Sequence, residues 1–165
     1  MLEDHHKIRE QMEPERYKKV SSVKTDLFQK VNFTGHSGDQ LHWKIECDAI
    51  TSLEWKCLAS MIMEYETRPF QSAIGIPRGG VELGKWLNEY STQNPEDPYL
   101  ICDDVLTTGG SFEEFTDSYF RNRDPSSGYF GWVVFARKKP QDWVTPLFQM
   151  PKKWIDNPNN IEYHK

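Results

Sequence analysis

The sequence predicts an α/β domain with a mostly parallel sheet that is flanked by helices. Residues 72–76 and 99–102 form apolar runs that indicate buried strands, and residues 129–136 are rich in aromatic and β-branched side chains, which favour strands. Patterns of helical spacing stand between these runs, at 81–90 and 111–120. Strands that alternate with helices are typical of a parallel sheet, and their connections are expected to be right-handed crossovers.

The elements at the two ends of this pattern are less regular. Residues 43–48 alternate polar and apolar side chains with period two, as a half-buried strand does. Thr51 or Ser52 can cap a helix, with Glu54 placed for a capping box, and the helical spacing then continues to about Tyr65. A last short strand is expected at 143–148, and polar loops at 91–98 and 122–128 separate the elements before it.

Length and composition restrict the class of protein. The 165 residues suit one domain with a sizeable core, and the formal net charge of −5 argues against a general nucleic-acid or membrane-surface binder. No apolar stretch approaches the roughly 18–20 residues that span a bilayer, and the first residues lack the apolar centre of a secretory signal. The three cysteines show no metal-binding spacing, so a reduced, cytoplasmic setting is expected.

The run Tyr99-Leu100-Ile101-Cys102-Asp103-Asp104-Val105-Leu106-Thr107-Thr108-Gly109-Gly110-Ser111 carries the most information about function. A buried strand is expected to end at the two carboxylates, and a loop of small residues then opens a helix. Such a loop presents backbone N–H groups and hydroxyls to a phosphate, and the helix dipole adds to the attraction. Two carboxylates beside a phosphate require sugar hydroxyls or a divalent cation between them, and Mg²⁺ with several waters suits that arrangement.

This run resembles the phosphoribosyl-pyrophosphate signature of the type I phosphoribosyltransferases. The resemblance implies that Asp103 and Asp104 hold the ribose hydroxyls directly or through Mg²⁺ and are the catalytic pair. It also implies that the loop from Thr107 through Thr108, Gly109 and Gly110 to Ser111 holds the 5-phosphate. Without the resemblance, the same run would be a strand that ends in a solvated acidic turn.

A second stretch resembles the pyrophosphate-binding loop of that family. Its residues are Pro77, Arg78, Gly79 and Gly80. The two glycines allow a ligand to approach the backbone closely, and the arginine offers a planar fork of donors to phosphate oxygens. Taken alone, a Pro-x-Gly-Gly turn is common, so this assignment depends on the signature run.

Residues 33–38 and 43–46 resemble, more loosely, the N-terminal hood that covers the base in orotate phosphoribosyltransferases. His36, Lys44 and Arg137 are then expected to contact the base. Where that family usually has a lysine before the Ser-Gly pair, this chain has His36, so orotate itself is in question as the substrate. Arg137 ends the expected strand at 129–136, although residues 137–139 also read as a solvated basic turn.

The resemblance divides the single domain, residues 1–165, into four parts. These are a charged arm (1–22), the hood (23–50), the core (51–150) and a polar tail (151–165). Family members usually carry a further strand and a long mobile catalytic loop before the signature strand. Here residues 81–98 leave room for one helix and a short connection, with Lys85 as their only basic residue, so the loop is expected to be missing.

The expected function is phosphoribosyl transfer in nucleotide synthesis or salvage. The resemblance implies transfer of ribose-5-phosphate from phosphoribosyl pyrophosphate to a nitrogen base, with Mg²⁺ as cofactor and a homodimer as the family's usual assembly. The missing loop keeps a second hypothesis open: a sensor that binds phosphoribosyl pyrophosphate or a nucleotide on the same fold without turnover. An interaction protein with an inactive site is a third reading, which leaves the signature run unexplained.

Overall fold

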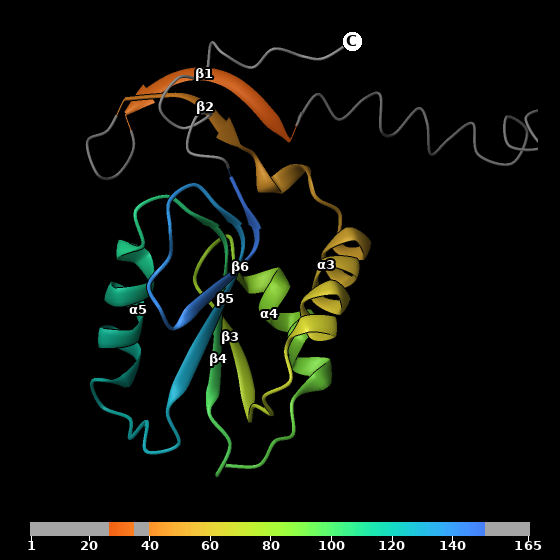
Figure 1. Ribbon diagram of the computed structural model, residues 1–165, viewed down its shortest axis with the longest axis vertical. Coiled ribbons are helices and arrows are strands. Elements are labelled where there is room, and N and C mark those ends of the chain that lie inside the picture. Colours follow the sequence, from red (N-terminus) through yellow and green to blue (C-terminus); the bar gives the residue numbers. More distant parts are fainter. Residues whose placement is uncertain (1–26, 35–39, 151–165) are drawn as a thin grey trace, which may run out of the picture.

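The computed structural model describes residues 27–34 and 40–150, and the arm, the tail and the hood turn that contains His36 lie outside them. A four-stranded sheet forms the centre of the molecule, and a two-stranded sheet lies above one end of it (Figure 1). The helices and strands are β1 (Phe28–Thr34), β2 (Gln40–Ile45), η1 (Cys47–Ala49), α3 (Ser52–Tyr65), β3 (Ser72–Gly75), α4 (Val81–Leu87), η2 (Asn88–Tyr90), β4 (Tyr99–Leu106), α5 (Gly110–Phe120), β5 (Tyr129–Ala136) and β6 (Val144–Gln149).

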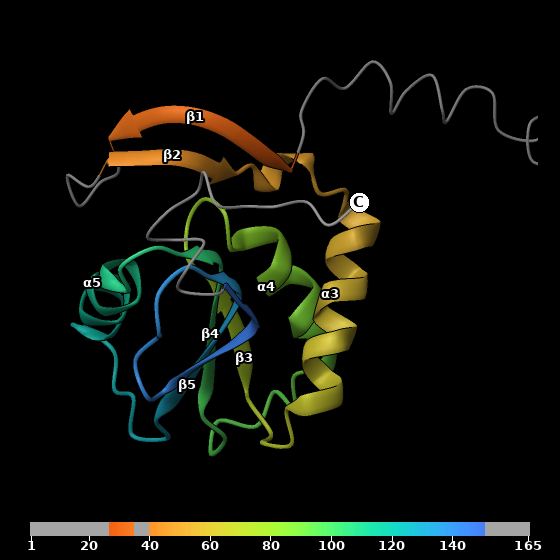
Figure 2. The ribbon, with the colours of Figure 1, turned by 45° about the horizontal axis from the view of Figure 1, so that its top comes forward.

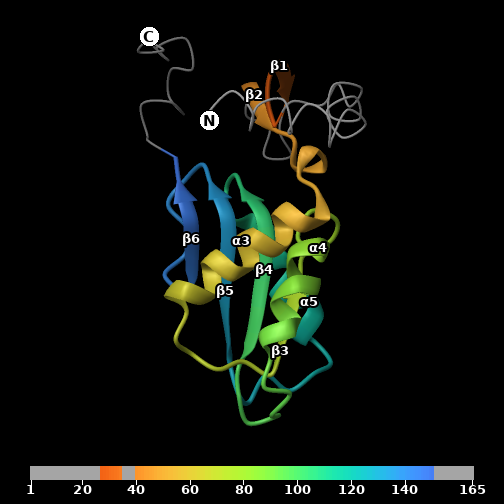
Figure 3. The same cartoon turned by 90° about the vertical axis from the view of Figure 1, so that its right-hand side faces the viewer.

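The central sheet is parallel throughout and has the strand order β3-β4-β5-β6. All four strands therefore point the same way, and their carboxyl ends meet at the edge of the sheet below β1 and β2 (Figure 3). Helices α3 and α4 cover one face of the sheet, and α5 covers the other (Figure 1). The α/β class, the parallel sheet and the flanking helices are confirmed.

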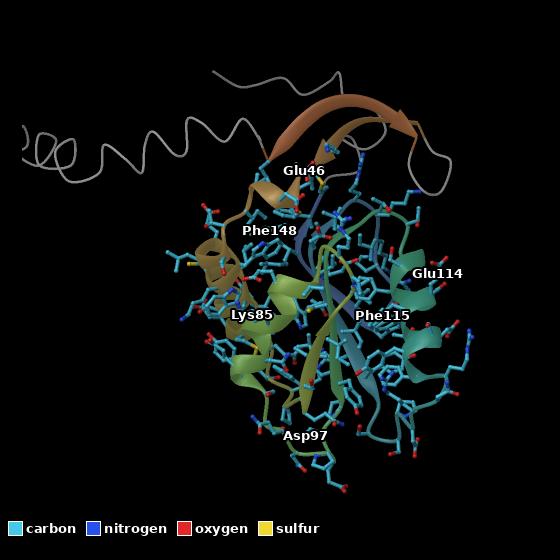
Figure 4. The ribbon with its side chains drawn as sticks, turned by 180° about the vertical axis from the view of Figure 1, so that it is seen from behind. Glu46, Lys85, Asp97, Glu114, Phe115 and Phe148 are labelled. Carbon is cyan, nitrogen blue, oxygen red and sulfur yellow. The ribbon has the colours of Figure 1, made fainter. Side chains whose placement is uncertain are left out.

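Two apolar clusters hold the helices on the sheet. One joins α3 and α4 to the central strands through Trp55, Leu83 and Val134, and the other joins α5 to the opposite face through Phe112 and Val133. Leu83, Phe112, Val133 and Val134 are fully buried, and burial of a large apolar side chain contributes about 1.5–3 kcal/mol. On α5, Phe115 faces the sheet while Glu114 faces outward (Figure 4).

The start of α3 follows the capping box that the sequence predicts. The Thr51 hydroxyl accepts from the Glu54 backbone N–H at 3.3 Å, and the Glu54 carboxylate accepts from the Thr51 N–H at 2.7 Å. Helix α4 is shorter than expected, because α-helical hydrogen bonding ends at Leu87 and a 3₁₀ turn follows.

Asn88, in that turn, pairs with the free edge of β3. Its side-chain amide donates to the Ala73 carbonyl at 2.6 Å and accepts from the Ala73 N–H at 2.9 Å. The side chain therefore satisfies the two backbone groups that a neighbouring strand would otherwise use.

The small N-terminal sheet is an antiparallel pair, β1 with β2, as the hood resemblance implies (Figure 2). The strand expected at 43–48 ends earlier, at Ile45. The Glu46 N–H bonds to the Leu27 carbonyl at 2.7 Å, and Cys47–Ala49 turns into a short 3₁₀ helix. This 3₁₀ helix, which we call the hood linker, connects the hood to α3.

Residues 81–98 contain α4, η2 and a short connection, and no strand. The Gln71 side-chain amide donates to the Asp97 carbonyl at 2.7 Å, which ties this connection to the start of β3. Asp97 lies at the end of the molecule opposite to Glu46, which lies below the hood (Figure 4). The expected absence of a long catalytic loop is confirmed, and the connection that replaces the loop stays away from the carboxyl ends of the strands. Within the described residues, no helix is long and apolar enough to cross a membrane.

Candidate phosphoribosyl-pyrophosphate site

The two carboxylates of the signature run lie inside β4 rather than after it. The sequence predicted that the strand would end at Asp103, but pairing with β5 continues through Val105 and Leu106. Each carboxylate accepts from the backbone N–H of the next residue: Asp103 from Asp104 at 2.9 Å, and Asp104 from Val105 at 2.7 Å. These bonds satisfy part of the hydrogen-bonding capacity of two acidic side chains in an otherwise apolar strand.

The environments of the two carboxylates differ. Asp103 is only 6% exposed, whereas Asp104 is half-buried. Burial, and then the neighbouring Asp104 charge, raise the pKa of Asp103 well above its ordinary value. Asp103 therefore favours its neutral form, and a cation or a developing positive charge on a sugar at this point of β4 would favour its charged form and be stabilised by it.

The glycine-rich turn at 77–80 packs directly against the acidic pair. A Cβ atom on Gly79 would lie 2.2 Å from an Asp104 carboxylate oxygen, so a larger residue there would displace that carboxylate. A Cβ atom on Gly80 would lie 2.4 Å from the Cys102 carbonyl oxygen, and the Ile76 N–H bonds to that same carbonyl at 2.8 Å. The peptide bond between Pro77 and Arg78 is cis. The structure thus brings together two motifs that are about 25 residues apart in the sequence.

The loop of small residues occupies the turn between β4 and α5. Gly109 has a positive φ of 91° and stands at the N-cap position of α5, which begins one residue earlier than expected, at Gly110. The Gly110 N–H points toward the Thr108 hydroxyl at 3.5 Å, and Thr107, Thr108 and Ser111 are exposed. Backbone N–H groups and hydroxyls therefore converge at the N-terminus of an 11-residue helix, as an anion site requires.

The three residues expected to contact the base have different outcomes. Arg137 is buried, with its N–H bonded to the Leu106 carbonyl at 2.8 Å, and burial lowers the pKa of its guanidinium. The alternative of a solvated basic turn is therefore wrong for this side chain. Lys44 forms an ion pair with Glu46 below the hood. His36 lies outside the described residues.

Cys47, in the hood linker, is a site residue that sequence reasoning missed. Its side chain is 8% exposed and lies close enough to Asp104 for the two groups to interact electrostatically. Burial raises the pKa of this thiol, and the Asp104 charge raises it further, so the thiol stays neutral. No spacing in the sequence indicates this proximity, because it joins the hood linker to the middle of the chain.

A cavity of about 490 Å³ opens beside the hood linker. It is lined by Leu27, Ala49, Ile50, Glu54, Cys57, Leu58 and Phe135. Apart from the Glu54 carboxylate these side chains are apolar or weakly polar, so this cavity lacks the donors of a phosphate site.

The donor set around the acidic pair fits Mg²⁺. The described part of the chain holds no group of three or more histidine, cysteine or carboxylate side chains that could enclose a metal. Magnesium usually takes only one or two carboxylates and completes its shell with water and substrate phosphates. Asp103 and Asp104 offer that number, next to a turn suited to phosphate.

Comparison with solved structures shows which fold this arrangement belongs to. Orotate phosphoribosyltransferase from Aeropyrum pernix is 19% identical, with a TM-score of 0.54, over 72% of this chain and 80% of that one. The Mycobacterium tuberculosis H37Rv orotate phosphoribosyltransferase, solved with Fe(III) dicitrate, is 11% identical, with a TM-score of 0.56, over 83% of this chain and 97% of that one. Leishmania donovani UMP synthase is 17% identical, with a TM-score of 0.54, over 78% of this chain and 34% of that one.

Comparison by sequence adds no relative. No model of a protein family matches the chain, and no curated protein matches it. The likeness therefore lies in the overall fold and not in the sequence. The chain has the fold of the type I phosphoribosyltransferases.

Proposed function

We propose that this protein transfers ribose-5-phosphate from phosphoribosyl pyrophosphate to a nitrogen base and releases pyrophosphate. The observation that carries the proposal is the contact between Gly79 and the Asp104 carboxylate. This contact supports the proposal because the turn at 77–80, which we expect to bind phosphate, lies beside the acidic pair, and β4 leads through one short loop to the helix N-terminus at Gly110. A ligand that bridges all three groups needs a phosphate at each end and hydroxyls between them, as phosphoribosyl pyrophosphate has.

Each group has a distinct task in this reaction. Positive charge grows on the sugar as the pyrophosphate leaves, and the Asp104 carboxylate stabilises that charge from a fixed position. The loop at 107–111 holds the 5-phosphate, and Arg78 neutralises charge on the departing pyrophosphate. Mg²⁺, held by the acidic pair, would supply a Lewis acid to the pyrophosphate oxygens.

We propose that the base lies between the hood and the carboxyl end of β5. Arg137 follows β5 directly, and Lys44 lies on β2 near its end. The ion pair between Lys44 and Glu46 leaves less free positive charge below the hood than a lone lysine would. An orotate-like base with a carboxylate would depend mainly on Arg137 for its binding. Other nucleobases are also candidate substrates, so the panel below includes them.

The test is the release of pyrophosphate from Mg²⁺–phosphoribosyl pyrophosphate in the presence of orotate, uracil, adenine, guanine, hypoxanthine or nicotinate. Wild-type protein is expected to release pyrophosphate with one base or a few related ones. Asp104→Asn is expected to lower turnover at least about 100-fold while the fold survives. Asp117→Asn, on the exposed side of α5, is the matched control and should turn over normally. Near wild-type turnover by Asp104→Asn would remove the central role of this carboxylate.

The short connection at 88–98 favours a second candidate function, a sensor that binds the same ligand without turnover. Closure over substrates excludes water and completes a catalytic site, and this connection lies at the far end of the sheet. A sensor should show calorimetric binding of phosphoribosyl pyrophosphate and no base-dependent release of pyrophosphate. Base-dependent release would exclude the sensor.

A further inference from the structure

Gln141 lies on the loop between β5 and β6 and packs against the phosphate loop. Its amide nitrogen donates to the Gly109 carbonyl at 2.8 Å and lies 3.5 Å from a Glu113 carboxylate oxygen. The face of the amide covers the Cα atom of Gly109, since a Cβ there would lie 2.7 Å from the amide nitrogen and 2.9 Å from the amide oxygen. A side chain 32 residues along the chain therefore supports the N-cap residue of α5.

The carbonyl that Gln141 holds belongs to the peptide that presents the Gly110 N–H. In a trans peptide the C=O and the N–H point in opposite directions, so fixing one fixes the other. The Gly109 carbonyl accepts from Gln141 at 2.8 Å and, at the longer distance of 3.2 Å, from the Phe112 N–H, and the Gly110 N–H points toward the exposed Thr108 hydroxyl at 3.5 Å. Gln141 thereby aims a phosphate donor from the opposite side of the loop.

The other half of the Gln141 amide is an unusual feature. Its oxygen is buried and has no hydrogen-bond partner among the residues that the structure describes. Turning the amide over would place this oxygen against the Gly109 carbonyl, where two acceptors would repel, so the nitrogen must face Gly109. A buried acceptor without a partner lowers stability, and its presence is explained if the donor on the same amide is needed.

We propose that Gln141 is the positioning residue of the phosphate loop and orients the Gly109–Gly110 peptide for the 5-phosphate of the sugar. This inference rests on the proposed function, because it assigns the 5-phosphate to that loop. It predicts that Gln141 acts on the affinity for ribose 5-phosphate and leaves pyrophosphate, which binds at the separate turn at 77–80, unaffected.

The test compares the binding of ribose 5-phosphate and of Mg²⁺–pyrophosphate by calorimetry in the wild type and in Gln141→Met. Methionine keeps the length of the side chain, loses the donor and removes the unpartnered oxygen. We expect binding of ribose 5-phosphate to weaken about three- to tenfold, as loss of one hydrogen bond does. Pyrophosphate binding and the midpoint of urea unfolding should not change.

Gln71→Met is the matched control. Gln71 also donates from its amide to a backbone carbonyl, that of Asp97, but at the other end of the sheet. This variant should bind both ligands as the wild type does. Gln141→Asn, whose amide is one methylene shorter, repeats the test if Gln141→Met does not fold.

The outcomes separate the two proposals. Equal binding of ribose 5-phosphate by the wild type and the folded Gln141 variant would overturn the role of Gln141 and leave the proposed function standing. Weaker binding of both ligands would also overturn the role of Gln141, because the effect of the substitution would not be confined to the phosphate loop. A wild-type protein that binds neither ligand would overturn the proposed function, and the role of Gln141 with it.

Discussion

At Asp103, burial and a neighbouring charge both favour the protonated form of the side chain. The folded chain keeps this proton at pH values where the unfolded chain, whose aspartate titrates near 3.8, has already lost it. Between these two pKa values the folded state binds more protons, so the free energy of unfolding falls as the pH rises. A carboxyl group that lowers the free energy of unfolding at neutral pH is typical of residues retained for function.

Asp103→Asn is therefore expected to stabilise the fold. The amide oxygen can still accept from the Asp104 N–H, and the charge is gone. The free energy of unfolding should exceed that of the wild type by about 1–3 kcal/mol at pH 7–8, and by less at pH 5. Urea unfolding of both proteins at pH 5, 7 and 8 measures this difference in the free energy of unfolding. A constant difference across the pH range would contradict the stated ionisation of Asp103.

Among single residues, the sequence could predict those whose role depends on their neighbours in the chain. Asp103, Asp104 and the loop that follows them form one contiguous run, so their side of the site could be identified in advance. Cys47 and Gln141 act through contacts with residues more than 30 positions away, and neither belongs to a motif. Their roles depend on tertiary packing, which local patterns do not encode.

At the scale of the elements, prediction succeeded where one signal was unambiguous. The capping box fixes the start of α3, and the aromatic and β-branched run coincides with β5. Prediction failed where side chains competed with local pattern. The strand β4 continues past its acidic pair because its pairing with β5 extends through Val105 and Leu106, and β2 ends before Glu46 because the chain turns into the hood linker.

Docking of the hood linker on the core can be measured through the cysteines. Cys57 is exposed, whereas Cys47 and Cys102 are buried, and burial raises the pKa of both buried thiols. In the native protein one thiol should react rapidly with a disulfide reagent at pH 7.5, and the other two should react only after unfolding.

Cys57→Ser should remove the rapid reaction completely. Rapid reaction of Cys47 in this variant would show that the hood linker often separates from the core. It would contradict the burial of Cys47 beside Asp104.

At the scale of the whole molecule, one buried carboxylate outside the candidate site joins the end of α3 to the central sheet. Glu66, after the last turn of α3, is buried and accepts from the Arg68 guanidinium at 2.8 Å and from the Trp132 indole at 2.7 Å. Burial opposes its ionisation, but these hydrogen bonds outweigh burial and hold the pKa of Glu66 below its ordinary value. Its contribution to stability is present above about pH 4.5 and is lost as the pH falls through the lower folded-state pKa.

Glu66→Ala is expected to lower the free energy of unfolding by about 2–4 kcal/mol, because it leaves the buried indole N–H without its acceptor. Ribose 5-phosphate and pyrophosphate should bind to the folded variant as tightly as to the wild type. Denaturant unfolding and calorimetry make the two measurements. If the free energy of ligand binding falls by as much as the free energy of unfolding, then Glu66 and the candidate site are coupled.

The amide of Asn88 has a consequence for how copies of this chain can associate. The β3 strand has a neighbour on one side only, and Asn88 occupies the backbone groups of Ala73 on the other. At the opposite margin of the sheet, β6 carries Pro146, which has no N–H to donate. Neither margin presents an unbroken row of free donors and acceptors, so the sheet is protected against extension into a continuous intermolecular ribbon. We therefore expect an assembly of this protein through its core to join helix surfaces or loops in preference to sheet edges.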